Sequence, residues 1–231
     1  MDEPKEIRLD RCILFDLDGT LYDSADYSRR LEEEIARFVS EKLSLDLDST
    51  KALLKQRRKE LGTLTRTLES LGIDRNLFFD SMAARIEPAE YLTEDARVHV
   101  VINTLKEEGF KVGLVSNSGR PLVEKILKAL RIDPSVFDAL VTSSDVRPKP
   151  SPEPFLLALK LLNCTTATAI YIGDRDEAEL HPAKELRIRT ILLDRVGNTS
   201  ARWADVVVTN LSEIPRVAKT IMPTRSVEMV G

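Results

Sequence analysis

The segment Ile13–Ser24, with the sequence ILFDLDGTLYDS, begins as an apolar run and then turns acidic. Asp16, Asp18 and Asp23 lie close together in it, and Gly19 stands among them. A turn accounts for an Asp beside a Gly, but Asp16 still lies inside the apolar run. Carboxylates that repel one another at the end of a buried strand indicate that some other charge compensates them.

The composition is that of a globular protein, with 231 residues, 42% hydrophobic and 31% charged. The net charge of −4 predicts no general attraction to nucleic acid polymers or anionic membranes. The sequence lacks a bilayer-spanning apolar run, and its first ten residues lack the apolar core of a signal peptide. Cys12 and Cys164 have no partners at metal-ligand spacing, which favours buried, reduced thiols. We therefore expect a cytoplasmic protein.

Downstream of the opening segment, residues 25–92 have the apolar spacing of helices. One helical face carries Tyr27, Leu31, Ile35, Phe38 and Val39. A second helix is predicted from Ser49 to Gly62, and two shorter ones follow. The segment is far too long for one crossover between strands, so we interpret it as an inserted helical domain.

Beyond residue 93, predicted strands alternate with amphipathic helices. The predicted strands are 11–16, 111–116, 139–143, 169–174, 189–194 and 205–210. The predicted helices are 94–109, 121–130, 152–162 and 179–186. This alternation predicts an α/β fold, a Rossmann-like doubly wound parallel sheet covered by helices on both faces. The predicted core domain comprises residues 1–24 and 93–231, and residues 25–92 form an all-helical cap domain.

Polar residues follow the predicted strands at the ends that meet at one edge of the sheet, where open α/β sheets bind their ligands. They are Asp16, Asp18, Ser116, Asn117, Lys149 and Asp174. Clustered carboxylates are costly unless a cation compensates them, and Mg²⁺ commonly binds carboxylates together with a substrate phosphate. A lysine, a hydroxyl and an amide would supply positive charge and donors. The sequence thus predicts a phosphate pocket beside Mg²⁺.

Four short motifs occur in a fixed order along the chain. They are DLDGT (16–20), SNS (116–118), KPSP (149–152) and GD (173–174). In this order, each at a strand end, they resemble the four motifs of the haloacid dehalogenase (HAD) superfamily. The resemblance covers nearly the whole chain, including the helical cap between the first two motifs. The GTLYDS continuation and the cap are most similar to small-molecule phosphatases of the phosphoglycolate phosphatase or pyrimidine 5′-nucleotidase type.

The resemblance implies a role for each residue of the first motif. Asp16 would be the nucleophile that forms an aspartyl-phosphate. Asp18 would protonate the leaving group and then activate water, while its backbone carbonyl ligates Mg²⁺. Gly19 would permit the tight turn, and Thr20 would help to orient Asp18.

The later motifs would supply the phosphate and metal contacts. The resemblance implies that Ser116, Asn117 and Lys149 bind phosphoryl oxygens, and that Asp174 holds the metal with Asp16. The fourth motif, GDRDEAEL (173–180), departs from the family pattern, which has a second Asp a few residues after Gly-Asp. Glu179 fits that second acidic position best, and Asp176 is its competitor.

An acid two residues after the nucleophile favours phosphate chemistry, because carbon–halogen cleavage has no ester leaving group to protonate. We therefore expect a Mg²⁺-dependent phosphatase that hydrolyses a small phosphomonoester: a sugar phosphate, phosphoglycolate or a nucleotide. One alternative is phosphotransfer of the phosphosugar mutase type. Another is a non-catalytic HAD-like module that binds a phosphorylated ligand or a protein. The oligomeric state stays open, as does the role of the basic cap stretches SRR (28–30) and KQRRK (55–59).

Overall fold

The computed structural model of the chain describes residues 10–197 and 201–222. Its sheet contains six parallel strands in the order β3-β2-β1-β4-β5-β6. The strands are β1 (Arg11–Phe15), β2 (Phe110–Val115), β3 (Ala139–Val141), β4 (Ala169–Gly173), β5 (Arg189–Leu193) and β6 (Val206–Val208). From β1 the strand order runs outward in both directions, which confirms the predicted doubly wound sheet. The point where the order reverses lies at β1 and β4.

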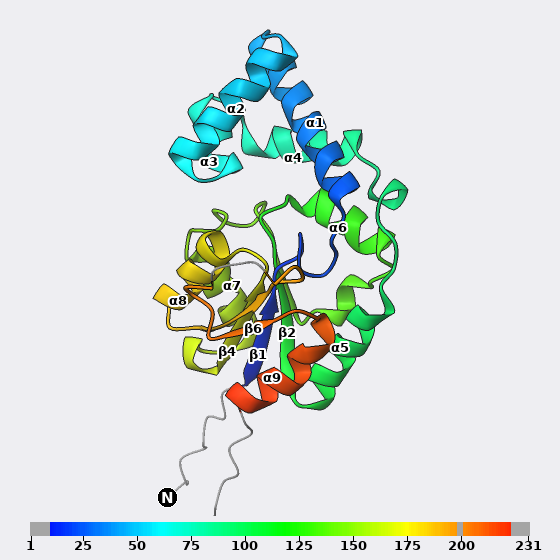
Figure 1. The fold of residues 1–231 in the computed structure, drawn as a ribbon, viewed down its shortest axis with the longest axis vertical. Helices are drawn as coiled ribbons and strands as arrows, with labels where there is room; N and C mark the ends of the chain where they lie inside the picture. Colours follow the sequence, from blue (N-terminus) through cyan, green and yellow to red (C-terminus); the bar gives the residue numbers. More distant parts are fainter. Residues whose placement is uncertain (1–9, 198–200, 223–231) are drawn as a thin grey trace, which may run out of the picture.

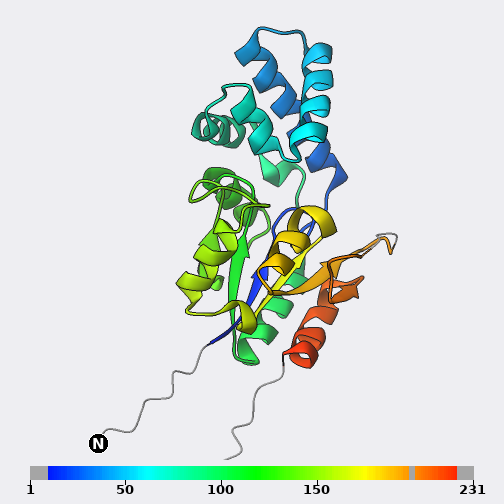
Figure 2. The ribbon, with the colours of Figure 1, turned by 90° about the vertical axis from the view of Figure 1, so that its left-hand side faces the viewer.

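Helices cover both faces of the sheet (Figures 1 and 2). One face packs against α5 (Ala96–Glu107), α6 (Arg120–Ala129) and α9 (Ile214–Ile221), and the other against α7 (Glu153–Leu162) and α8 (His181–Glu185). Alternate residues of β1 enter the two cores: Ile13 and Phe15 pack into one core, and Cys12 and Leu14 pack into the other. This two-sided burial explains why the strand is an unbroken apolar run.

Four helices, inserted between β1 and α5, lie beyond the carboxyl ends of the strands (Figure 1). They are α1 (Ala25–Leu43), α2 (Leu47–Leu61), α3 (Leu64–Ser70) and α4 (Arg75–Arg85). The side chain of the residue before each helix accepts a bond from a backbone N–H in its first turn. The predicted domain boundaries stay a prediction, and residues 1–9, 198–200 and 223–231 of the predicted core lie outside the described part.

Several predicted helix limits differ from the structure. Helix α2 begins before Ser49 because Asp46 is its N-cap and accepts a hydrogen bond from the Ser49 N–H at 2.9 Å. The predicted helix 179–186 is instead a π-helical turn, η4 (Asp176–Leu180), followed by α8. Helix α9 was not predicted. The remaining short elements are the 3₁₀ turns η1 (Pro88–Glu90), η2 (Pro134–Val136), η3 (Thr166–Thr168) and η5 (Leu211–Glu213).

The helical insert contacts the core at several points. The two connecting segments touch where the Ser24 hydroxyl donates to the Tyr91 carbonyl at 3.3 Å. Helix α4 packs on α6 so closely that a Cβ on Gly119 would lie 2.4 Å from Phe79. Lys125 of α6 also donates to a carbonyl at the end of α4, that of Ile86, at 2.7 Å. These contacts place the insert above the edge of the sheet where the predicted site residues lie.

Two further observations concern the described residues. Cys12 is buried, Cys164 is half-buried, and both are free thiols. None of the helices described is both long enough and apolar enough to cross a membrane.

Candidate active site

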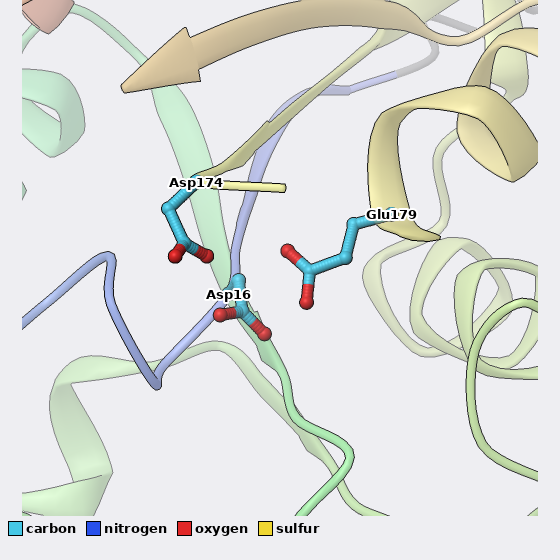
Figure 3. Close-up of side chains that lie close together, drawn as sticks. All are labelled: Asp16, Asp174 and Glu179. Atoms are coloured by element: carbon cyan, nitrogen blue, oxygen red, sulfur yellow. The ribbon is translucent and has the colours of Figure 1, made fainter. Parts of the chain in front are cut away.

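Three carboxylates from separate elements meet at the carboxyl edge of the sheet. Asp16 follows β1 and is 2% exposed, Asp174 follows β4, and Glu179 comes from η4 and is 1% exposed. One oxygen of each lies within 4.8 Å of the others. Figure 3 shows the three carboxylates lying close together. We call Asp16, Asp174 and Glu179 the acidic cluster.

Lys149 reaches the acidic cluster from the loop after β3 and is fully buried. Its Nζ donates to Asp16 Oδ1 at 2.5 Å and to the Tyr171 hydroxyl at 2.7 Å, and it lies 3.3 Å from Glu179 Oε1. Burial alone would lower the pKa of Lys149, but the carboxylates of Asp16 and Glu179 outweigh it and raise that pKa. Lys149 is therefore a permanent positive charge beside Asp16.

The cluster still holds more negative than positive charge. Arg175 adds a second cation, 3.1 Å from Glu179, and this neighbour raises the pKa of Arg175. Burial and the charge of Glu179 raise the pKa of Asp16 well above its usual value, and they raise the pKa of Asp174 to about 6. Without a further cation, these surroundings thus disfavour the ionised forms of Asp16 and Asp174.

The donor set fits a metal ion. Asp16 Oδ2 and Asp174 Oδ1 are buried and have no hydrogen-bond partner among the described residues. Unpaired buried carboxylate oxygens are costly, and hard divalent cations bind such oxygens. Gly19 keeps the space beside Asp174 open: its φ is +85°, and a Cβ there would lie 2.2 Å from Asp174 Oδ2. The acidic cluster could therefore hold a divalent cation.

Asp18 has a different environment, made of hydroxyl groups. Its Oδ2 accepts hydrogen bonds from Ser118 at 3.0 Å and from Ser116 at 3.4 Å, and its Oδ1 accepts one from Tyr22. The carboxylate of Asp18 thus faces neutral hydroxyl groups, whereas that of Asp16 faces the charged Lys149 and the other two acids. Two carboxyl groups in such different settings are suited to different chemical tasks.

Two predicted site residues have surroundings that the sequence did not indicate. The Asn117 side chain donates to the Lys149 carbonyl at 2.9 Å and accepts from the Lys149 N–H at 2.8 Å, so it fixes the lysine loop. Thr20 is fully buried, and its Oγ1 has no hydrogen-bond partner among the described residues. Their roles in binding phosphate and orienting Asp18 stay predictions.

The two candidates for the second acidic position have different partners. Asp176 accepts hydrogen bonds from the N–H groups of Arg202 at 2.8 Å and Trp203 at 3.0 Å, so its carboxylate holds that loop. Glu179 instead joins the acidic cluster. The structure thus brings Glu179, and not Asp176, to Asp16 and Asp174.

Sequence reasoning missed two residues that contact the cluster. Tyr171, whose hydroxyl bonds Lys149, lies inside the apolar run of β4, where nothing marks it as different from a core residue. Arg175 directly follows Asp174, so the sequence could have indicated that its basic side chain lies near the carboxylates. The arginines of the stretches 28–30 and 55–59 form ion pairs within the helical insert: Arg29–Asp26, Arg30–Glu34, Arg57–Glu60 and Arg58–Glu32.

A doubly wound parallel sheet with buried carboxylates at its switch point defines an α/β protein with an acidic site. Residues 11–186 match the model of the haloacid dehalogenase-like hydrolase family, so the chain belongs to this family, as the four motifs predicted. It is 30% identical to the phosphoglycolate phosphatase of Aquifex aeolicus, over 79% of this chain and 84% of that one. It is also 30% identical to the pyrophosphatase PpaX of Bacillus velezensis, over 70% and 73%.

Solved structures share the fold. A HAD phosphatase from Thermococcus onnurineus superposes with a TM-score of 0.69 at 20% identity, covering 90% of this chain and 97% of the other. A 2-haloacid dehalogenase from Pseudomonas syringae gives 0.64, also at 20% identity, covering 92% and 100%. Phosphatases and dehalogenases thus share this architecture, and the chemistry must be argued from the site.

Proposed function

We propose that the protein is a Mg²⁺-dependent phosphatase that hydrolyses a small phosphomonoester through an aspartyl-phosphate on Asp16. The observation that carries this proposal is the setting of the Asp16 carboxylate. Its Oδ1 is held by the Lys149 ammonium at 2.5 Å, while its Oδ2 is buried and unpartnered among the described residues. A cation and a bound phosphate would complete such a site.

The residues divide the reaction between them. An oxygen of Asp16 attacks phosphorus, and the P–O bond to the leaving group breaks as the new bond forms. Asp18 gives its proton to the departing oxygen and then takes one from the water that hydrolyses the aspartyl-phosphate. Lys149 and the loop of Ser116 and Asn117 bind the phosphoryl oxygens. Mg²⁺ bound by Asp16, Asp174, Glu179 and the Asp18 carbonyl would supply positive charge to the transferring group.

The presence of Asp18 favours phosphate esters over carbon–halogen bonds, because an alkoxide leaving group needs a proton and a halide does not. Relatives named phosphoglycolate phosphatase and pyrophosphatase support a small phosphorylated substrate. We further propose that residues 25–92 act as a cap that closes over the substrate. The free thiols of Cys12 and Cys164 support a cytoplasmic site of action.

The test is hydrolysis of p-nitrophenyl phosphate by the purified protein in Mg²⁺. We expect activity that chelator abolishes and fresh Mg²⁺ restores. Asp16→Asn should lower kcat by on the order of 10³-fold or more, because an amide cannot act as the nucleophile. Asp23→Asn is the matched control: it makes the same change at an exposed position in the same segment and should leave kcat within about twofold of wild type.

Activity that survives chelator, or an active Asp16→Asn protein, would overturn the proposal.

Once activity is established, a panel of phosphorylated compounds would identify the substrate. It should include phosphoglycolate and inorganic pyrophosphate, because relatives carry those names, and also sugar phosphates and nucleoside monophosphates. Release of free phosphate, rather than an isomerised product, separates hydrolysis from phosphotransfer.

A further inference from the structure

We infer that Tyr22 is a positioning residue: its hydroxyl fixes the carboxyl group of Asp18 in the orientation that protonates the leaving group. This inference rests on the proposed phosphatase function. Tyr22 lies in the segment that joins β1 to the helical insert, and it is 9% exposed.

The two oxygens of Asp18 face different parts of the molecule. Tyr22 donates to Oδ1, from the side of the connecting segment. Ser118 and Ser116 bond Oδ2, from the loop proposed to bind the phosphoryl group. With Oδ1 held by Tyr22, the oxygen left on the side of the loop proposed to bind the phosphoryl group is Oδ2. The Tyr22 hydroxyl therefore sets which oxygen of Asp18 delivers the proton.

The ring of Tyr22 is itself fixed by its neighbours. Its backbone forms a bridge with Asp18, four residues earlier. Its ring packs edge-on against that of Tyr27, with centroids 5.7 Å apart and planes at 80°. Tyr27 is 1% exposed and packs in turn against Tyr91, at 6.4 Å. Tyr22 thus has a rigid aromatic support that includes both segments connecting the insert to the core.

Packing alone does not account for the hydroxyl of Tyr22, because a phenylalanine ring would make the same contacts. The neighbouring Tyr27 provides a comparison within the same cluster: its hydroxyl is buried and has no hydrogen-bond partner among the described residues. The hydroxyl groups of the two tyrosines therefore differ in the bond that Tyr22 makes to Asp18. Substituting each by phenylalanine separates this bond from the packing of the rings.

A misplaced acid slows only those reactions that need it. In the first step, the Asp16 oxygen bonds to phosphorus while the bond to the leaving oxygen breaks and the Asp18 proton moves to that oxygen. Phenolate needs this proton more than p-nitrophenolate, which leaves readily as an anion. The value of kcat/KM reports the reaction up to departure of the leaving group, so it isolates this step from hydrolysis of the aspartyl-phosphate.

The experiment measures kcat/KM for phenyl phosphate and p-nitrophenyl phosphate with Tyr22→Phe. General acid catalysis contributes roughly 10²–10⁴-fold, and loss of orientation removes part of it. We expect the value for phenyl phosphate to fall about 10-fold more than the value for p-nitrophenyl phosphate. Tyr27→Phe, the matched control, should lower both by less than about twofold. In an Asp18→Asn background, Tyr22→Phe should have no further effect, because no acid remains to be oriented.

Equal falls in kcat/KM for the two substrates with Tyr22→Phe would overturn the inference and give Tyr22 a purely structural role. A further fall in kcat/KM when Tyr22→Phe is added to Asp18→Asn would do the same. An effect of Tyr27→Phe as large and as selective as that of Tyr22→Phe would also overturn it. Failure of the proposed function looks different: the wild type would then hydrolyse neither substrate, or Asp16→Asn would hydrolyse both.

Discussion

Lys149 carries a buried positive charge that balances two carboxylates, at 2.5 Å from Asp16 and 3.3 Å from Glu179. Lys149→Met keeps much of the side-chain volume but leaves both acids without this partner. Removing one member of a buried ion pair typically costs about 3–5 kcal/mol. We expect the free energy of unfolding, measured with urea in chelator at pH 7, to fall by about that amount, and phosphatase activity to be lost.

An exposed lysine gives the matched control. Lys219 is 57% exposed and pairs with Glu108 at 2.7 Å. Because water screens such pairs, Lys219→Met should change the free energy of unfolding by at most about 1 kcal/mol. If Lys149→Met cost no more than Lys219→Met, the ammonium would not be what stabilises the acidic cluster.

Among the site residues, the sequence predicted those that follow strand ends. Asp16, Lys149 and Asp174 meet because parallel strands place their carboxyl ends at one edge, a rule that needs only the order of the strands. Tyr171 could not be predicted in the same way, because its contact with Lys149 depends on which side chains fill the space between β4 and the lysine loop. The bonds of Asn117 to the Lys149 backbone could not be predicted for the same reason.

At the scale of elements, strands and long helices were predictable because burial dictates their patterns. Strand β1, buried on both faces, is an apolar run, and Gly62 ends α2 with a φ of +81° that favours glycine. The π-helical turn η4 was not predictable, since a wider turn leaves no distinct apolar period. This turn carries Glu179 into the acidic cluster. An element that the sequence did not predict therefore positions the residue at which the fourth motif departs from the family pattern.

The contact between α4 and α6 leaves no room for a side chain at Gly119. Its φ of −71° is open to any residue, so Gly119→Ala tests the steric contact alone. A Cβ would lie 2.4 Å from Cβ and Cγ of Phe79. Overpacking of this kind typically costs about 1–3 kcal/mol, and we expect that loss in the free energy of unfolding measured with urea.

The same substitution in a Phe79→Gly background provides the control. With the Cβ and the ring of Phe79 both removed, the new methyl group has space, so Gly119→Ala should cost less than about 0.5 kcal/mol there. Additive effects of the two substitutions would show that the strain arises elsewhere in the α6 start.

For the whole molecule, the acidic cluster should make stability depend on pH. Burial and Glu179 raise the pKa of Asp174 from 3.8 to about 6. Between these values the folded state keeps a proton at this carboxyl that the unfolded chain has lost, so rising pH lowers the free energy of unfolding. In chelator, the stability of Asp174→Asn relative to wild type should therefore increase from pH 4 to pH 7.

Urea unfolding of both proteins at several pH values measures this difference. Added Mg²⁺ should stabilise the wild type more at pH 7 than at pH 5, because protons and the cation compete for the same carboxylates. A stability difference between the two proteins that stays constant over this range would contradict the raised pKa.

The two segments that join the helical insert to the core touch each other, through the bond from Ser24 to the Tyr91 carbonyl. The chain thus leaves and re-enters the core at adjacent points. Any other folded body whose ends lie equally close could replace the insert without altering a single strand. In evolutionary terms, the part proposed to close over the substrate is exchangeable, while the part proposed to perform the chemistry can be inherited unchanged.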